Sequence, residues 1–292
     1  MDDLLKKLEE QYKDVPIPQN LDAVVEASLK KGRKKKKAPK WVIGGVAAAI
    51  LFTASLNVSP AMARNLVDIP VIGSIVEVLT FVSYEVEKDT YSANIEVPKI
   101  NGNSEEITAL NEKYAEEGKA LYEQFKEEMD SMDQAGGGHL GVDSGYVVAT
   151  DTDQILSVGR YVVNTAGSSS TVMKYDTVDK LKEIVITLPS LFKDNSYVSI
   201  ISENVAEQMR EQSKASNGEK VYWVSGAGIP DEELYEQFTT IKADQNFYIT
   251  AQGKLVIVFD KYEVAPGYMG IVEFEIPTEL LKDTLVSSEY IK

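Results

Sequence analysis

The side chains that could perform catalysis are few in this sequence. It has no cysteine and one histidine, His139, which excludes a thiolate nucleophile and the several imidazoles that most zinc enzymes use. Because His139 lies in the glycine-rich stretch AGGGHL, we interpret it as a loop residue and not as a positioned base. Asp151 and Asp153 could act as a pair of carboxylates, but we interpret them as turn caps. We therefore predict no catalytic residue, no metal site, no cofactor and no enzymatic activity.

Two stretches carry side chains that suit protein binding instead. In YEVAPGYMG, residues 262–270, a Pro-Gly turn signal precedes Tyr268 and Met269 between two predicted strands. Tyr and Met are common anchors at protein interfaces, although a packed corner of the domain would use the same residues. NTAGSSST, residues 164–171, is polar and rich in serine, which predicts a second loop that adapts to a partner.

A third stretch has the features of a proteolytic site. In SLNVSPAMARNL, residues 55–66, the triplet Ala61-Met62-Ala63 precedes Arg64. A signal peptidase accepts small residues at the first and third positions of such a triplet. The sequence therefore predicts a cut after Ala63.

The residues before this site predict a membrane anchor. The uncharged run WVIGGVAAAILFTASL, with its flank to Ser59, gives about 28 Å of helix, close to the thickness of the hydrocarbon core. Eight basic residues precede it between residues 30 and 40, so the positive-inside rule places the N-terminus in the cytoplasm and the C-terminal part outside the cell. We predict a basic stop at 33–40 and a transmembrane helix at 41–59. A cleaved signal peptide is the alternative, which an amphipathic segment upstream argues against.

That amphipathic segment, residues 1–32, predicts two short helices separated by Pro16 and Pro18. Helices of this length are marginal on their own, so their apolar faces need a partner, each other or the membrane surface. We favour a protein partner. The side chains predicted to bind it are Leu4, Leu5, Leu8, Tyr12, Leu21, Val24, Val25 and Leu29.

The remainder of the chain predicts an α+β fold. Residues 60–83 form a juxtamembrane region in which the broken apolar stretch NLVDIPVIGSIVEVLTFVS predicts an amphipathic helix. From residue 84 to 292 we predict one extracellular domain, an antiparallel sheet packed with helices. Its main elements are a long helix at 103–133, four strands between 145 and 188, and a hairpin about Gln252-Gly253.

Charge is divided unevenly along the chain. Residues 1–40 have eleven Lys and Arg and seven Asp and Glu, a net charge of +4. Residues 41–292 have nineteen Lys and Arg and thirty-nine Asp and Glu, a net charge of −20. This acidic body argues against nucleic acid as a partner and would attract a basic protein.

Several of these stretches together resemble a known family. The chain is similar to the RsiV-type transmembrane anti-sigma factors in four of these stretches: PIPQNLDAVVEASL in the helical pair, the basic stop, the membrane helix ending near Ala-x-Ala, and IPVIGSI. The resemblance continues in the outer domain and covers essentially the whole chain. The stretches that carry it there are LPSLFKD, DQNFYIT, LVIVFDKYEVAPGYMG and EFEIP. FDKYEVAPGYMG also resembles a domain found beside peptidoglycan deacetylase modules, and no such module is present in this sequence.

The resemblance implies a signalling role. The cytoplasmic helices would sequester an extracytoplasmic-function sigma factor of the sigma-V type, and the outer domain would bind and inhibit lysozyme. Lysozyme binding would expose the chain to signal peptidase, and a site-2 intramembrane protease would complete release of the sigma factor. The residues that the resemblance places at the lysozyme contact are Ser168, Ser169, Ser170, Ala265, Pro266, Gly267, Tyr268 and Met269.

Two other functions remain open at this stage. A secreted or anchored lysozyme inhibitor would share the outer domain but would not bind a sigma factor. A wall-binding protein would bind peptidoglycan without a preference for lysozyme.

Overall fold

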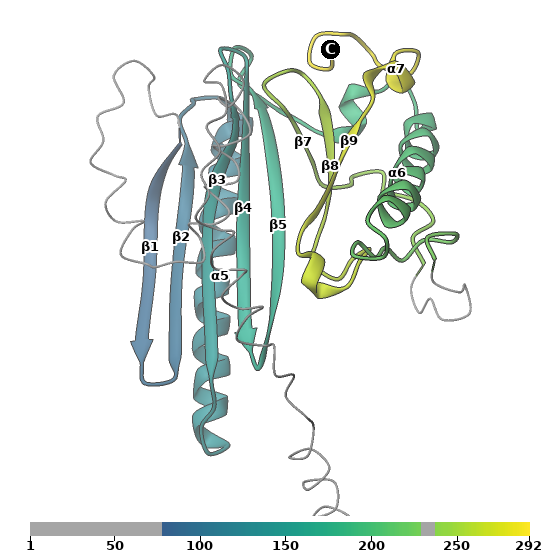
Figure 1. Cartoon of the computed structure of the whole chain (residues 1–292). Coiled ribbons are helices and arrows are strands. Elements are labelled where there is room, and N and C mark those ends of the chain that lie inside the picture. The colour runs from purple at the N-terminus through teal and green to yellow at the C-terminus, as the bar shows by residue number, and fades with distance from the viewer. Residues whose placement is uncertain (1–77, 229–236) are drawn as a thin grey trace, which may run out of the picture. The chain divides into compact units, whose positions relative to one another are not determined.

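The computed structural model describes residues 78–228 and 237–292 (Figure 1). The helical pair at 1–32, the basic stop, the membrane helix at 41–59 and the cleavage site at Ala61-Met62-Ala63 lie outside these ranges. Within them, no helix combines the length and apolar character needed to cross a membrane. The predicted sigma-factor contacts and the cut after Ala63 therefore stay predictions.

A six-stranded sheet forms the first half of the described chain, with its strands in chain order. All neighbours pair antiparallel except β2 and β3, which pair parallel and correct the expectation of a purely antiparallel sheet. A parallel pair needs a long crossover, and the helix between these two strands provides it. The strands are β1 (Val78–Lys88), β2 (Tyr91–Ile100), β3 (Leu140–Asp151), β4 (Ile155–Ala166), β5 (Ser168–Asp179) and β6 (Ile184–Ile186).

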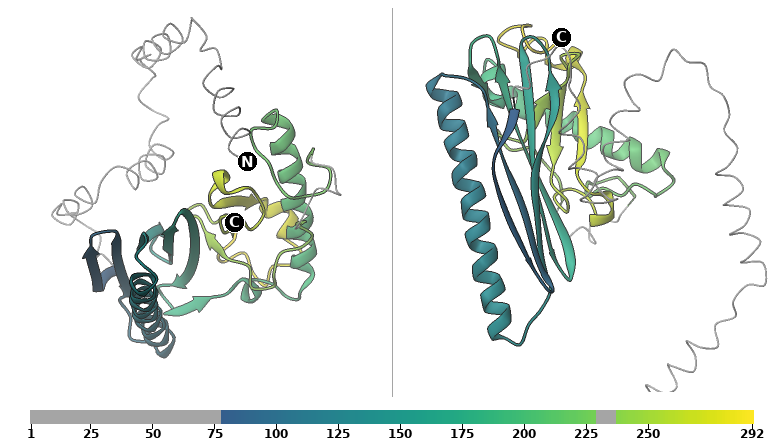
Figure 2. Two further views of the ribbon diagram at one scale, coloured as in Figure 1. Left: turned by 90° about the horizontal axis from the view of Figure 1, so that it is seen from below. Right: turned by 90° about the vertical axis from the view of Figure 1, so that its left-hand side faces the viewer.

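The crossover helix, α5 (Glu105–Gln134), lies along one face of this sheet (Figure 2). It begins where the Ser104 hydroxyl accepts a hydrogen bond from the Ile107 N–H at 3.1 Å, and two glutamates follow in the first turn, where the helix dipole favours negative charge. Its buried residues, Ile107, Leu110, Tyr114 and Phe125, fall at helical spacing. The long helix predicted from the sequence is confirmed.

The start of β1 differs from the sequence prediction. Residues 78–83 were expected to end an amphipathic helix, but they pair with β2 as a strand. Val82 and Tyr84 face α5, and Tyr84 stacks on Tyr122 with ring centroids 4.9 Å apart. The apolar run contains spacings of both two and three to four residues, and pairing with β2 selects the spacing of two. The folded domain therefore starts no later than Val78, before the predicted boundary at residue 84.

A three-stranded sheet forms the second half and packs against α6 (Ser196–Ala215) through Tyr197, Ile201, Val205 and Met209. The predicted hairpin about Gln252-Gly253 is confirmed, since Gly253 has a φ of +74° between the first two strands of this sheet. Its elements are β7 (Phe247–Ile249), β8 (Leu255–Phe259) and β9 (Val272–Ile276), with η1 (Leu188–Leu191), η3 (Gly267–Met269) and α7 (Thr278–Leu281).

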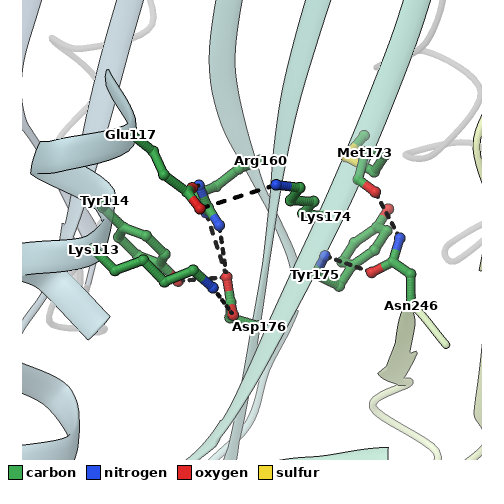
Figure 3. A network of polar contacts seen from close by, with 9 residues as sticks. All are labelled: Lys113, Tyr114, Glu117, Arg160, Met173, Lys174, Tyr175, Asp176 and Asn246. Atoms are coloured by element: carbon green, nitrogen blue, oxygen red, sulfur yellow. Dashed lines mark hydrogen bonds and ion pairs between the residues drawn. The ribbon is translucent and has the colours of Figure 1, made fainter. Parts of the chain in front are cut away.

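The small sheet is joined to the large one along β5. The Asn246 side chain accepts from the Tyr175 N–H at 2.8 Å and donates to the Met173 carbonyl at 2.6 Å (Figure 3). Tyr175 also packs on Tyr248, with ring centroids 4.7 Å apart. Since successive residues of a strand point to opposite faces and Asp176 contacts α5, Tyr175 and the small sheet lie on the face opposite the helix.

On the helix side, Arg160 holds α5 to β4 and β5 (Figure 3). Its guanidinium reaches Glu117 of α5 at 2.5 Å and Asp176 of β5 at 3.2 Å, and lies 4.2 Å from the ring centroid of Tyr114. The Tyr114 hydroxyl donates to the same Asp176 carboxylate at 3.0 Å. Burial acts to raise the pKa of Glu117, but the hydrogen bond and charge of Arg160 hold it below its usual value. The Glu117 carboxylate is therefore ionised at every pH at which its pair with Arg160 stabilises the fold.

We predict that Arg160→Met lowers the free energy of unfolding by about 3 kcal/mol, because it leaves the largely buried Asp176 carboxylate without its main partner. Lys119→Met is the matched control, since it removes an exposed cation that pairs with Glu123 one helical turn away. We expect that change to cost less than about 0.5 kcal/mol. Equal midpoints for the two variants in urea denaturation would contradict the role given to Arg160.

Candidate functional site

The two stretches predicted to bind a partner meet at one end of the large sheet. This far end carries the turn between β4 and β5 and lies at the opposite end of the strands from Val78. Ser168, Ser169 and Ser170 belong to β5 and pair with Ala166, Thr165 and Asn164. The predicted polar loop is therefore wrong, because the hairpin register continues to a turn at Gly167, whose φ is +79°. The serines are held in extended backbone and do not form an adaptable loop.

The second stretch begins with a tight turn after β8. The Glu263 N–H donates to the Asp260 carbonyl at 3.0 Å, and Tyr262 has a φ of +71°, in the left-handed region. Ala265 is 1% exposed in the core, which removes it from the predicted contact residues. Met269 is half-buried and packs against the same core, so the stretch is partly a packed corner.

Tyr268 is the most exposed side chain of this stretch, at 67%. Its hydroxyl donates to the Glu219 carbonyl at 3.0 Å, which fixes the ring although most of its area is open to solvent. Tyr262 is 47% exposed, and its ring covers Gly267. A Cβ atom at Gly267 would lie 2.2 Å from that ring, so any other residue there would displace the Tyr262 side chain.

Lys261 connects the two stretches. Its ammonium donates to the Ser169 carbonyl at 2.7 Å and lies 3.0 Å from the Ser169 hydroxyl. Its backbone N–H donates to the Thr171 carbonyl at 3.3 Å, and the neighbouring Asp260 carboxylate accepts from the Met173 N–H at 2.8 Å. Burial raises the pKa of Asp260 and the charge of Glu263 adds to the rise, while the Met173 N–H acts against them. Backbone pairing and one ammonium thus hold the serines beside Lys261, the residue directly before the stretch 262–270.

We call this the far-end surface: Ser168–Ser170, Tyr262 and Pro266–Tyr268. It presents two tyrosine rings, serine hydroxyls and backbone groups held by hydrogen bonds. Sequence reasoning missed Tyr262 and the connecting Lys261. The left-handed turn under Tyr262 leaves no clear sequence signal, and the Lys261 contact joins residues 92 positions apart. Such a surface can bind a protein, and it has the aromatic anchors that dominate interface energies.

The residues considered for catalysis do not assemble into a site. Asp151 forms an ion pair with Lys180 at 2.8 Å, and Asp153 belongs to the turn that follows. The cap of that turn is Thr152, whose hydroxyl accepts from the Ile155 N–H at 2.8 Å, so the predicted caps are one residue away on either side. Among the described residues, no group of three or more His, Asp or Glu is placed to hold a metal ion.

A family model matches part of the second half of the chain. The family described as "Protein of unknown function (DUF3298)" matches residues 189–279, which contain the small sheet and the Pro-Gly-Tyr stretch. The structure of a DUF3298 family protein from Pseudomonas aeruginosa PAO1 is similar over 74% of this chain and 96% of that chain, with 12% identity and a TM-score of 0.52. This likeness confirms the α+β fold. A member from Bacteroides fragilis NCTC 9343 covers 72% of this chain and 94% of that chain, with 14% identity and a TM-score of 0.47.

A curated relative matches along the whole sequence. The anti-sigma-V factor RsiV of Bacillus subtilis (strain 168) is 44% identical over 295 residues, and the alignment covers 100% of both chains. The described domain, the Pro-Gly-Tyr stretch and the residues before Val78 all lie within that alignment. The chain therefore belongs to the RsiV family of anti-sigma factors.

Proposed function

We propose that this chain is a membrane-bound anti-sigma factor that senses lysozyme with its outer domain. The observation that carries the anti-sigma role is the 44% identity to RsiV over the full chain. The amphipathic residues of segment 1–32 would sequester an extracytoplasmic-function sigma factor of the sigma-V type in the cytoplasm. The chain would cross the membrane once, at 41–59, with residues 78–292 outside the cell.

Binding of lysozyme is supported by the far-end surface. The resemblance implied contacts in two stretches separated by about ninety residues, and Lys261, directly before the second stretch, contacts Ser169 of the first. Tyr268 is exposed and held by a hydrogen bond, which reduces the entropy lost when a partner orders it. Lysozymes of the animal type are basic, and a net charge of −20 on residues 41–292 would speed their approach. Binding at this surface would inhibit lysozyme.

Release of the sigma factor would follow from proteolysis. We assign the first cut to signal peptidase, between Ala63 and Arg64, and the second to a site-2 intramembrane protease. The small residues at Ala61 and Ala63 support the first cut. Gly44 and Gly45 in the predicted membrane helix support the second, because glycine lowers the cost of unwinding a helix before cleavage.

We expect Tyr268→Ala to weaken lysozyme binding by about 2 kcal/mol or more, because truncation removes a central aromatic anchor. Titration calorimetry of the full chain in detergent measures this directly. Tyr268→Phe keeps the ring and removes the hydrogen bond to Glu219, so its loss of lysozyme affinity should be smaller than that of Tyr268→Ala. Val148→Ala, an exposed apolar residue on β3, is the control and should bind as the unmodified chain does. Unchanged affinity in Tyr268→Ala would rule out this surface as the lysozyme contact.

Ala63→Trp should abolish the lysozyme-dependent cut after residue 63, because signal peptidase does not accept a large side chain at that position. Mapping the new N-terminus of membrane-embedded chain, with and without lysozyme, gives the result. Met62→Trp is the matched control, since the middle position of the triplet tolerates large residues. Cleavage of Ala63→Trp at the same bond would show that another protease makes the cut.

Leu8→Glu and Val25→Glu should each reduce retention of the sigma factor by the full chain, because each places a charge on a predicted apolar face. A pull-down from detergent-solubilised membranes measures retention. Lys6→Glu on the opposite face is the control. If the unmodified chain retains no sigma factor, the signalling role fails and a lysozyme inhibitor without signalling becomes the better interpretation.

A further inference from the structure

Exposed apolar side chains gather at the end of the domain where β1 begins. The register places the start of β1, the end of β2, the end of β3 and the turn between β5 and β6 at one end of the large sheet, here called the Val78 end. Figure 1 shows α7 and the C-terminus at the same end. Of the eight large apolar side chains exposed in the described ranges, five lie there: Leu79, Phe81, Leu181, Leu280 and Val286.

The remaining exposed apolar residues are distributed differently. Tyr262 and Tyr268 belong to the far-end surface, and Val148 lies on β3 three residues before the end of that strand at the Val78 end. The two ends of the sheet thus present different chemistry: two tyrosine rings at the far end, and four aliphatic side chains with one phenylalanine at the Val78 end. Leu181 is the most exposed of all, at 74%, although it occupies a turn where a polar residue would be the ordinary choice.

The aliphatic side chains at the Val78 end are held by an ordered framework. Asp179 is buried and accepts hydrogen bonds from the Leu181 N–H at 2.9 Å and the Tyr290 hydroxyl at 2.8 Å, which fixes the turn and the C-terminal tail together. Lys182 pairs with Glu289 at 2.6 Å, and the Val286 N–H donates to the Leu191 carbonyl at 3.0 Å. Leu181 and Val286 therefore project from fixed backbone.

We propose that the Val78 end rests on the surface of the lipid bilayer, with Leu79, Leu181 and Val286 inserted among the headgroups. The inference rests on the proposed function, because it requires the membrane anchor at 41–59. Eighteen residues lie between that segment and Val78, and even fully extended they span about 60 Å at most. So short a tether keeps the Val78 end near the bilayer at high effective concentration, and a few apolar contacts are then enough to dock it.

Phe81 and Lys99 at this end suit an interface with lipid. The Lys99 ammonium lies 5.1 Å from the ring centroid of Phe81. An aromatic ring and a cation together are common at the boundary of membrane and water.

Glu279 and Asp283, in contrast, are exposed carboxylates at this end that oppose contact with anionic lipid. Lys180 is paired with Asp151 and Lys182 with Glu289, so the contact would depend on apolar insertion more than on attraction to anionic lipid. Five exposed apolar side chains distributed over three segments are too few for a stable protein interface, which needs a contiguous buried core.

The absence of cysteine makes a direct test possible. Leu181→Cys and Val286→Cys, each in the full chain, are labelled with an environment-sensitive fluorophore and reconstituted into phosphatidylglycerol and phosphatidylethanolamine vesicles that contain a nitroxide lipid. We expect a blue shift and several-fold stronger quenching at both positions than at Asn164→Cys, an exposed far-end position outside the far-end surface. Ala48→Cys, within the predicted membrane helix, reports the anchor itself.

The outcomes separate this inference from the proposed anchor. Quenching at residue 48 but equally weak quenching at 181, 286 and 164 would overturn the docking and leave the anchor intact. No quenching at residue 48 would overturn the anchor, and the docking with it. A blue shift at 181 that depends on the ratio of protein to lipid would mean that a second copy of the chain covers this end, which also overturns the proposal.

Discussion

The free edge of β5 is the constraint on which the arrangement of this domain depends. One edge of β5 pairs with β4 over its full length, but the other pairs with β6 only at residues 177–179. The backbone groups of residues 169–175 on that edge need other partners, because unpaired groups in a covered sheet edge are costly. The small sheet supplies them: Asn246 bonds Met173 and Tyr175, and Asp260 bonds Met173. Lys261 continues the same ladder to Thr171 and Ser169.

This solution links stability to the far-end surface. The side chains that complete the edge of β5 come from the segments just before β7 and just after β8. The Pro-Gly-Tyr stretch follows directly, so the same bonds that join the sheets also set where Tyr262 and Tyr268 lie relative to the serines. On the other face, Arg160 binds α5 to β4 and β5. Strand β5 is therefore held on both faces, and a partner would meet a surface that is already organised.

Sequence reasoning succeeded where the determining interactions are local. The helical spacing of α5 and the turn at Gly253 each depend on neighbours within a few residues, and each was predicted. It failed where pairing partners are distant. The polarity of Ser168–Ser170 suggested a loop, but register with Asn164–Ala166 extends the hairpin. Burial of Ala265 and the contact of Lys261 with Ser169 depend on how the two sheets join, which a single sequence does not reveal.

The length of β4 and β5 separates the two ends of the sheet. The register places Val78 level with about Thr177 of β5, so Ser168–Ser170 lie about 25–30 Å along the strand direction from the level of Val78. The residues that would contact a partner there are remote from the start of β1, so a small molecule that filled the same surface would reach nothing near that strand's beginning. The steric bulk of a bound protein, which a small molecule lacks, extends beyond its contact residues.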